Sequence, residues 1–315
     1  MASSAKTAWR TGKAMIVEAG AALAGLWSLR SLAHWVILRG LRAPRVAHDL
    51  ARVHPGVAAD RVREVRISGR RGKSLAGWLV TPPGTAQRPA PAVLVMHGWG
   101  ANAAMMWPVV PPLHESGWAV LLIDARCHGH SDREAFTSMP RFAEDIAAGL
   151  AWLKHQPDID SDKLALLGHS VGAAACLLHA SRHHDVRAVV SLSAFAHPRE
   201  VMRGFMADKR VPYPVVGWYV MRHVQKVIGA RFDDIAPLNT IAGVQCPVLV
   251  VHGRQDAVVP AGDAVRLVAR SGRARLLQLE GDHDLREALA PHAAAVVAFQ
   301  HAANAERSPA TDGEP

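Results

Sequence analysis

The stretch Leu164-Ala165-Leu166-Leu167-Gly168-His169-Ser170-Val171-Gly172-Ala173 decides the fold. An apolar run of strand length precedes the pentapeptide 168–172, and a helix-forming run, 173–180, follows it. A serine on a tight turn between a buried strand and a helix exposes its hydroxyl group. The small residues two positions before and after it let the chain reverse without collision. The pattern therefore predicts a nucleophilic serine at position 170, at the carboxyl end of a buried strand.

Two more polar clusters follow strand-like runs in the second half of the chain. The run 247–251 leads to Asp256, and the run 276–279 leads to His283. A serine hydroxyl becomes a good nucleophile when an imidazole takes its proton, and a carboxylate holds that imidazole in the right tautomer. Ser170, Asp256 and His283 are therefore the predicted catalytic residues. A rival acid after the run 188–192 is less favoured, because that loop has no carboxylate before Glu200.

A glycine-bracketed turn follows the apolar run 92–96. Its sequence is His97-Gly98-Trp99-Gly100. Such a turn after a central strand presents backbone N–H groups to a bound substrate, so the Trp99 and Val171 amides are the predicted oxyanion donors. Val171 also heads the helix after the serine, where the helix dipole favours negative charge. For His97 we expect a bracing role in the loop.

The segment Asp124-Ala125-Arg126-Cys127-His128-Gly129-His130-Ser131-Asp132 follows the apolar run 119–123. It resembles the D-x-R-G-H-G-x-S-D loop of the α/β-hydrolase superfamily, whose members also carry their triads in the order Ser, Asp, His. Cys127 stands where that loop usually has glycine, which predicts a shifted or strained turn. His128 and His130 could suggest a metal site, but no further ligands accompany them at suitable spacing, which favours a loop role.

The resemblance covers about residues 60–304. The segments 75–80 and 246–260 make the chain most similar to the serine aminopeptidase-like and Bem46-like hydrolases. This implies a serine hydrolase that cleaves a carboxylic ester of a small molecule, with thioesters and amides as alternatives, and it implies no metal or organic cofactor. An acyltransferase using the same residues, and a non-catalytic binding protein on the same scaffold, remain open as other function classes.

The remaining patterns predict an α/β fold with an eight-stranded, mostly parallel, doubly wound sheet and a helical cap insertion. Each motif above lies at the carboxyl end of a strand, where such sheets bind ligands. The expected strands are 62–68, 74–81, 92–96, 119–123, 164–168, 188–192, 247–251 and 275–279. The expected helices are 104–116, 140–155, 171–182, 261–271 and 285–304.

The cap is the segment of about 195–244, where a short connection would be expected. Helices are predicted over 198–206 and 215–228, separated by Pro212 and Pro214. Its large apolar side chains could line an apolar substrate site or pack the cap onto the core, and both readings stay open. They are Met202, Phe205, Met206, Trp218, Tyr219 and Met221.

Charge is unevenly distributed along the 315 residues. The formal net charge is +9, but residues 1–73 carry +10 and residues 74–315 carry −1. The hydrolase-like part is thus nearly neutral, and no basic stripe with interleaved aromatic residues indicates a nucleic-acid partner. Three cysteines without close spacing argue against a disulfide framework and predict a reducing, cytoplasmic compartment.

Residues 1–45 form a basic, helical N-terminal region in this reading. Its apolar run, 14–38, is long enough to span a bilayer, but Glu18, Arg30 and His34 interrupt it. Trp27 and Trp35 between basic flanks suit a helix lying at anionic headgroups, so this region is a possible membrane anchor. A helix packed on the hydrolase body is the alternative. Residues 305–315 are predicted to be a disordered tail.

Overall fold

A computed structural model describes residues 23–25, 27–28, 30–50, 55–85 and 88–305. The chain divides into two compact units, residues 1–42 and residues 43–315. Residues 306–315 of the predicted tail, 305–315, and the first part of the apolar N-terminal run lie outside the described residues. The larger unit includes residues 43–45, which the sequence assigns to the N-terminal region, and residues 46–59, which it does not assign to a domain.

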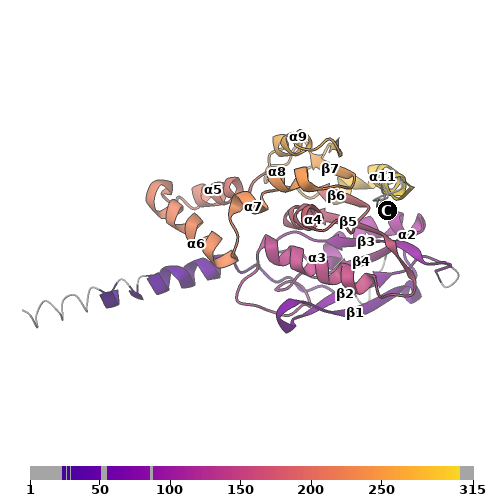
Figure 1. Cartoon of the computed structure of the whole chain (residues 1–315), viewed down its shortest axis with the longest axis horizontal. Helices are drawn as coiled ribbons and strands as arrows, with labels where there is room; N and C mark the ends of the chain where they lie inside the picture. Colours follow the sequence, from indigo (N-terminus) through magenta and orange to yellow (C-terminus); the bar gives the residue numbers. More distant parts are fainter. Residues whose placement is uncertain (1–22, 26, 29, 51–54, 86–87, 306–315) are drawn as a thin grey trace, which may run out of the picture. The chain divides into compact units, whose positions relative to one another are not determined.

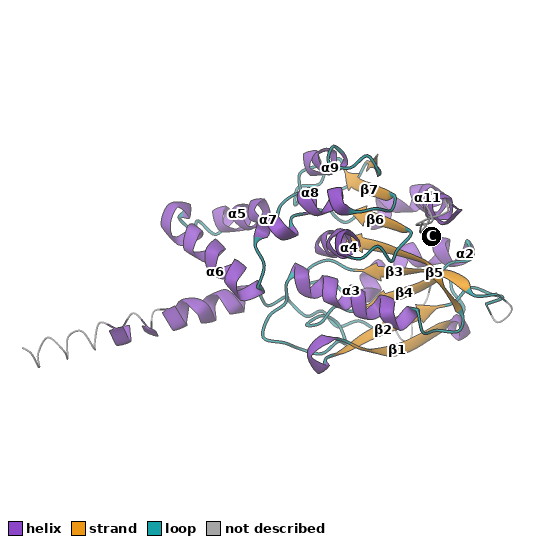
Figure 2. Ribbon diagram, in the orientation of Figure 1, coloured by secondary structure: helices purple, strands orange, loops and turns teal. Residues whose placement is uncertain are grey.

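The larger unit contains the predicted eight-stranded sheet, in the order β1-β2-β4-β3-β5-β6-β7-β8. Only β2 runs against its neighbours, β1 and β4, while the other adjacent pairs are parallel. Figure 2 shows the strands side by side in orange. The strands are β1 (Val62–Ser68), β2 (Ser74–Val80), β3 (Ala90–Met96), β4 (Ala119–Ile123), β5 (Ile159–His169), β6 (Ala188–Leu192), β7 (Val248–Gly253) and β8 (Ala274–Leu279).

The central strands are continuous apolar runs. This is expected for a sheet that helices cover on both faces, since side chains on both sides of each strand are then buried. Every residue of β4 and β6 is buried. β5 begins five residues before its predicted start, since the polar segment 159–163 extends the strand beyond the apolar run. Ala90 of β3 pairs with Ile159 across a register shift.

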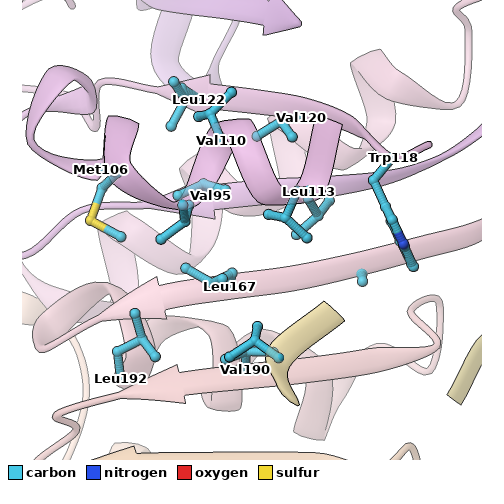
Figure 3. Packing of buried hydrophobic residues seen from close by; sticks show 14 of the residues in the cluster. Val95, Met106, Val110, Leu113, Trp118, Val120, Leu122, Leu167, Val190 and Leu192 are labelled. Carbon is cyan, nitrogen blue, oxygen red and sulfur yellow. The ribbon is translucent and has the colours of Figure 1, made fainter. Parts of the chain in front are cut away.

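Helices α3 (Met139–Leu153) and α4 (Val171–Arg182) pack on one face of the sheet. Gly149 of α3 permits this close contact, because a Cβ atom there would overlap the Leu94 side chain. The other face is covered by the 3-10 helix η3 (Ala103–Val109), α2 (Val110–Glu115) and α11 (Ala293–Ala305). Figure 3 shows Val110 and Leu113 of α2 over Val95 and Leu122 of the strands.

Three predicted helices differ from the observed ones. The first begins as η3, because Pro108 lacks the N–H group that an α-helix needs at that point. The last divides into α10 (Arg286–Leu289), η6 (Ala290–His292) and α11, with Pro291 inside the break. Helix α9 (Gly262–Val268) is shorter than predicted. The fold class is nevertheless the predicted one.

The cap follows β6 and is helical, as predicted. Figure 1 shows α5 and α6 in orange tones next to each other. A π-helical turn, η4, connects them at the prolines that the sequence places there. The cap elements are α5 (Pro198–Asp208), η4 (Tyr213–Gly217), α6 (Trp218–Ile228), α7 (Phe232–Ile235), α8 (Pro237–Thr240) and η5 (Ile241–Gly243).

The smaller unit is helical at the described residues between 23 and 40. Trp27 is 72% exposed and Trp35 is 56% exposed. Within the described part of the chain, no helix combines the length and the apolar character that crossing a bilayer requires.

Candidate active site

Ser170 lies on the predicted turn between β5 and α4. Its backbone is in a strained region, with φ 54° and ψ −117°. Gly168 is required here because a Cβ atom would lie 2.6 Å from the Ala173 nitrogen, and a Cβ on Gly172 would overlap the carbonyl oxygens of Met96 and His97. Such a conformation costs on the order of 1–3 kcal/mol and persists only where the surroundings enforce it. A strained serine between a strand and a helix is typical of a nucleophile turn.

Asp256 and His283 are brought together at the carboxyl ends of β7 and β8. Their Oδ2 and Nδ1 atoms lie 2.8 Å apart. The other Asp256 oxygen accepts hydrogen bonds from the Val258 and Val259 amides, at 2.9 and 2.7 Å. Because the carboxylate accepts the Nδ1 proton, Nε2 of His283 keeps the lone pair that a general base needs.

Backbone hydrogen bonds join the two loops that carry this pair. Arg254 N donates to Leu279 O at 2.8 Å, and Gln255 N donates to Gly281 O at 2.9 Å. Gly253 allows the approach, since a Cβ there would overlap the carbonyl oxygens of residues 281 and 282. From the sequence, the pairing of Asp256 with His283 could be predicted only because each residue follows a predicted strand. His252, which the sequence analysis did not single out, also lies near the acid, with Nε2 3.2 Å from Asp256 Oδ2.

His169 connects the serine turn to the His283 loop. Its Nε2 atom lies 2.8 Å from the His283 carbonyl oxygen, and the two rings are 4.9 Å apart. Burial is the largest influence on the pKa of His169 and lowers it, so the ring is neutral and donates through Nε2. Within the described chain, the Ser170 hydroxyl makes no hydrogen bond to His283. The structure thus pairs two of the three predicted residues and places the third on the adjoining turn.

The predicted oxyanion donors belong to residues near Ser170. Gly98, next to Trp99, is so close to the turn that a Cβ there would lie 3.3 Å from Ser170 Cβ. The Trp99 and Val171 amides donate to no acceptor among the described residues, so they are available to a ligand. Ser170 N is already engaged, because it donates to Leu192 O at 2.8 Å.

His97 has the expected bracing role. It is fully buried, its Nδ1 donates to Gly98 O at 2.7 Å, and its Nε2 accepts from Ala125 N at 3.0 Å. Burial, the largest influence, lowers its pKa. The neutral ring therefore joins the oxyanion loop to the segment after β4.

The loop 124–132 is organised around the Asp124 carboxylate. Burial alone would raise the pKa of Asp124, but the hydrogen bond from His48 and the amides of His130 and Ala103 bring it below its usual value. Cys127 has a φ of 70°. This confirms the strained backbone that was predicted because cysteine stands where the family loop usually has glycine. Gly129 must be glycine, because a Cβ would overlap Asp124.

The two histidines of that loop are occupied by main-chain groups. Nε2 of His128 accepts from Gly100 N at 3.1 Å, and its Nδ1 donates to Arg126 O. Burial lowers the pKa of His128 to about 3. Nε2 of His130 lies 2.9 Å from His48 O. These bonds support the loop role, and no set of three potential metal ligands comes together among the described residues.

Residues 44–48 form a strap that the sequence analysis missed. Arg45 donates to the carbonyl oxygens of Gly129 and Ser131, and Asn102 donates to Val46 O at 3.2 Å. Pro44 lies close to Gly100 in the oxyanion loop, because a Cβ atom on Gly100 would be 2.8 Å from Pro44 Cγ. The strap thus supports both loops beside the site. Its sequence has no strand or helix periodicity, so only the polar residues Arg45 and His48 could have drawn attention to it.

A cavity of about 430 Å³ reaches the site between η3–α2 and α10–α11. Its lining includes His169, Leu192 and His283. None of the six cap side chains named from the sequence contributes to it. Met206 and Met221 are buried, which supports the packing reading for them, whereas Phe205 and Trp218 are each 57% exposed.

Comparisons with known proteins agree with the fold. The profile of the alpha/beta hydrolase fold family matches residues 91–213, and that of a serine hydrolase family (FSH1) matches residues 162–285. Rv2307c, an uncharacterized protein of Mycobacterium tuberculosis H37Rv, is 33% identical over 207 residues, which are 66% of this chain and 66% of that protein. The polyketide transferase af380 of Aspergillus fumigatus is 33% identical over 129 residues, 40% of this chain and 43% of that enzyme.

A solved structure of the Pyrococcus furiosus esterase Pf2001 superimposes with a TM-score of 0.63 at 19% identity, covering 83% of this chain and 98% of the esterase. At this identity the likeness shows the fold. None of these descriptions names the narrower Bem46-like group, so that assignment stays a prediction. The strained serine turn, the sheet order and the two matching profiles lead to one conclusion. The chain belongs to the α/β-hydrolase superfamily.

Proposed function

We propose that the protein is a serine hydrolase that cleaves carboxylic esters through a covalent acyl-enzyme. The observation that carries this proposal is the 2.8 Å contact between Asp256 and His283 beside the strained Ser170 turn. Membership of the superfamily supports hydrolase activity in general. The triad, the oxyanion donors and the ester substrate are the finer parts of the proposal.

In the first half of the reaction, Nε2 of His283 takes the Ser170 proton as the hydroxyl oxygen attacks the ester carbonyl. The negative charge on the tetrahedral intermediate is held by the Trp99 and Val171 amides. Asp256 stabilises the imidazolium that forms, with its second oxygen fixed by two backbone amides. The imidazolium then protonates the leaving alcohol, and the acyl group remains on Ser170.

In the second half, His283 removes a proton from water, and the hydroxide attacks the acyl-enzyme. The same oxyanion donors act again, and Ser170 leaves with the proton from His283. The acid is released and the enzyme is restored. Each amide donor contributes about a hundredfold to a thousandfold to the rate in comparable sites.

The direct test is hydrolysis of p-nitrophenyl butyrate by the full chain and by Ser170→Ala. We expect turnover by the full chain and none above background by the variant, with an unchanged circular dichroism spectrum. Equal activity of the two proteins would contradict the proposal. No hydrolysis of any acyl ester by the folded full chain would favour the non-catalytic binding protein instead.

Acyl transfer is the second candidate function. Its support is the similarity over 129 residues to an enzyme whose name is polyketide transferase. The same acyl-enzyme would be resolved by an alcohol or amine in place of water. Product analysis with a competing nucleophile such as glycerol separates the two, because a transferase forms the new ester in preference to the free acid.

We also propose that the N-terminal region contacts an anionic membrane surface from the cytoplasmic side. Trp27 and Trp35 are exposed, and the Arg39 guanidinium lies 5.7 Å from the Trp35 ring centroid. Aromatic side chains among basic residues suit the headgroup region. The three cysteines are unpaired, as expected in a reducing compartment.

The test is co-sedimentation of the full-length protein with phosphatidylserine vesicles. The fraction that sediments should decrease in the Trp27→Glu and Trp35→Glu variants, and equal sedimentation of variants and wild type would contradict the proposal.

A further inference from the structure

The cavity beside His283 lies inside the hydrolase body. It runs between the helical layer η3–α2 and the helices α10 and α11, on the face of the sheet opposite α3 and α4. Its volume of about 430 Å³ falls within the range of sites that bind small molecules, roughly 300–1,000 Å³.

The lining is apolar over most of its extent. Met105 and Leu113 contribute from one side, and Val296 and Val297 of α11 contribute from the other. Figure 3 shows Met106 and Leu192, which also line the cavity, near the arrow tips of β5 and β6. An apolar wall of this kind favours a hydrocarbon group, since each buried methylene is withdrawn from water.

The charged groups of the described lining disfavour an anionic chain. No lysine or arginine is among the described residues that line the cavity, and its carboxylates belong to Glu115 and Asp284, both of which are exposed. A ligand with a phosphate or carboxylate at its buried end would meet no positive partner there, and burying such a charge is costly. The described lining therefore favours an occupant that is neutral along its length.

The cavity reaches His283, the candidate base. His283 and His169 line it, and so does Leu192, whose carbonyl oxygen accepts the Ser170 amide at 2.8 Å. Of the two halves of an ester, the alcohol must depart before water attacks, whereas the acyl chain stays attached to Ser170. A cavity between core helices suits the half that stays.

We propose that this cavity binds the acyl chain of the substrate, and that the substrate is an ester of a neutral, unbranched aliphatic acid. This inference rests on the proposed serine hydrolase function. If each carbon takes about the 30 Å³ of one water molecule, the volume of about 430 Å³ limits the chain to about 14 carbons. The cap contributes no residue to the described lining.

The test compares kcat/KM for p-nitrophenyl acetate, hexanoate and decanoate, each at monomeric concentrations. In the wild type we expect kcat/KM to rise by about fourfold for each added methylene until the cavity is full. Ala293, at the start of α11, lines the cavity, so Ala293→Phe should fill part of it and lower the decanoate to acetate ratio by at least tenfold.

Ala294→Phe is the matched control. Ala294 is the next residue of the same helix, it is exposed, and it does not line the cavity. The same substitution there should leave the ratio within twofold of the wild-type value. Thermal unfolding of both variants verifies that they fold.

A second variant enlarges the cavity instead of filling it. It keeps the inference testable if the first variant misfolds. Val297→Ala enlarges the cavity and should move the preferred chain to a longer acid. A wild type that hydrolyses esters with a flat chain-length profile, or ratios that neither variant changes, would overturn this inference and leave the hydrolase function standing. A wild type that hydrolyses no ester would overturn both.

Discussion

The side chain of His169 holds the main chain of His283: Nε2 of His169 lies 2.8 Å from the His283 carbonyl oxygen. The residue before the candidate nucleophile thus positions the loop of the candidate base. The two residues are 114 positions apart in the chain, so this hydrogen bond fixes two distant segments at the point where the proton must move. His169 is a positioning residue, because it acts through His283.

Replacing His169 by leucine should lower kcat by ten- to a hundredfold with little change in KM, because a displacement of about 1 Å in a catalytic group can cost a hundredfold. His169→Gln keeps an N–H donor of similar reach and should recover most of kcat. Steady-state kinetics of both variants provide the measurement. Equal losses in the two variants, or a loss confined to KM, would show that the hydrogen bond has no positioning role.

Asp256→Asn should lower kcat by about a thousandfold to ten-thousandfold, because an amide favours the wrong imidazole tautomer. Asp282→Asn is the control, since Asp282 is exposed on the loop of His283 and accepts only a local hydrogen bond from Asp284 N. It should change kcat less than twofold. If the two variants lose activity equally, Asp256 is not the acid of the triad.

Cys127 stores backbone strain at φ 70°. Cys127→Gly removes the clash of Cβ with the backbone, whereas Cys127→Ala keeps it, and the two lose the same thiol contacts. We expect the glycine variant to be more stable than the alanine variant by about 1 kcal/mol. Urea unfolding at neutral pH measures the difference. An alanine variant as stable as the glycine variant would mean that the turn is unstrained.

His128 should make the fold sensitive to acid. Its pKa is about 3 in the folded chain because it is buried, against 6.5 when exposed. Above pH 6.5 the ring is neutral in both states. Below that pH the unfolded chain takes up a proton that the folded chain refuses until about pH 3, so folding stability decreases as the pH falls through this window.

The matched comparison is His128→Gln, which removes the titrating group. Between pH 7 and pH 5 the wild type should lose on the order of 2 kcal/mol more unfolding free energy than the variant. Other buried histidines titrate in both proteins, so their contributions to the unfolding free energy cancel in the comparison. Identical losses, measured by urea unfolding at each pH, would contradict a neutral, buried His128.

Most of the sheet could be predicted because its strands are apolar runs with distinct boundaries. Val248 and its neighbours form one such run, and the structure places β7 within one or two residues of the prediction. The break at Pro108 was harder to foresee, because proline is tolerated in the first turn of a helix and the sequence does not tell where that turn begins.

The site was predictable where motif and strand end coincide, as at Ser170, Asp256 and His283. It was not predictable where irregular backbone matters. The Arg45 side chain of the strap donates to carbonyl oxygens, which no side-chain pattern in the loop 124–132 encodes. The cavity beside α11 likewise depends on how helices from distant parts of the chain pack, and the sequence directed attention to the cap instead.

The most direct test of the account is covalent labelling with a fluorophosphonate probe, followed by peptide mass spectrometry. An activated serine reacts with such a probe, whereas an ordinary hydroxyl does not. We predict a single modified peptide carrying the label on Ser170, with labelling abolished in Ser170→Ala and strongly reduced in His283→Ala. Absence of labelling in the folded wild type, or labelling that persists without His283, would contradict the proposed triad.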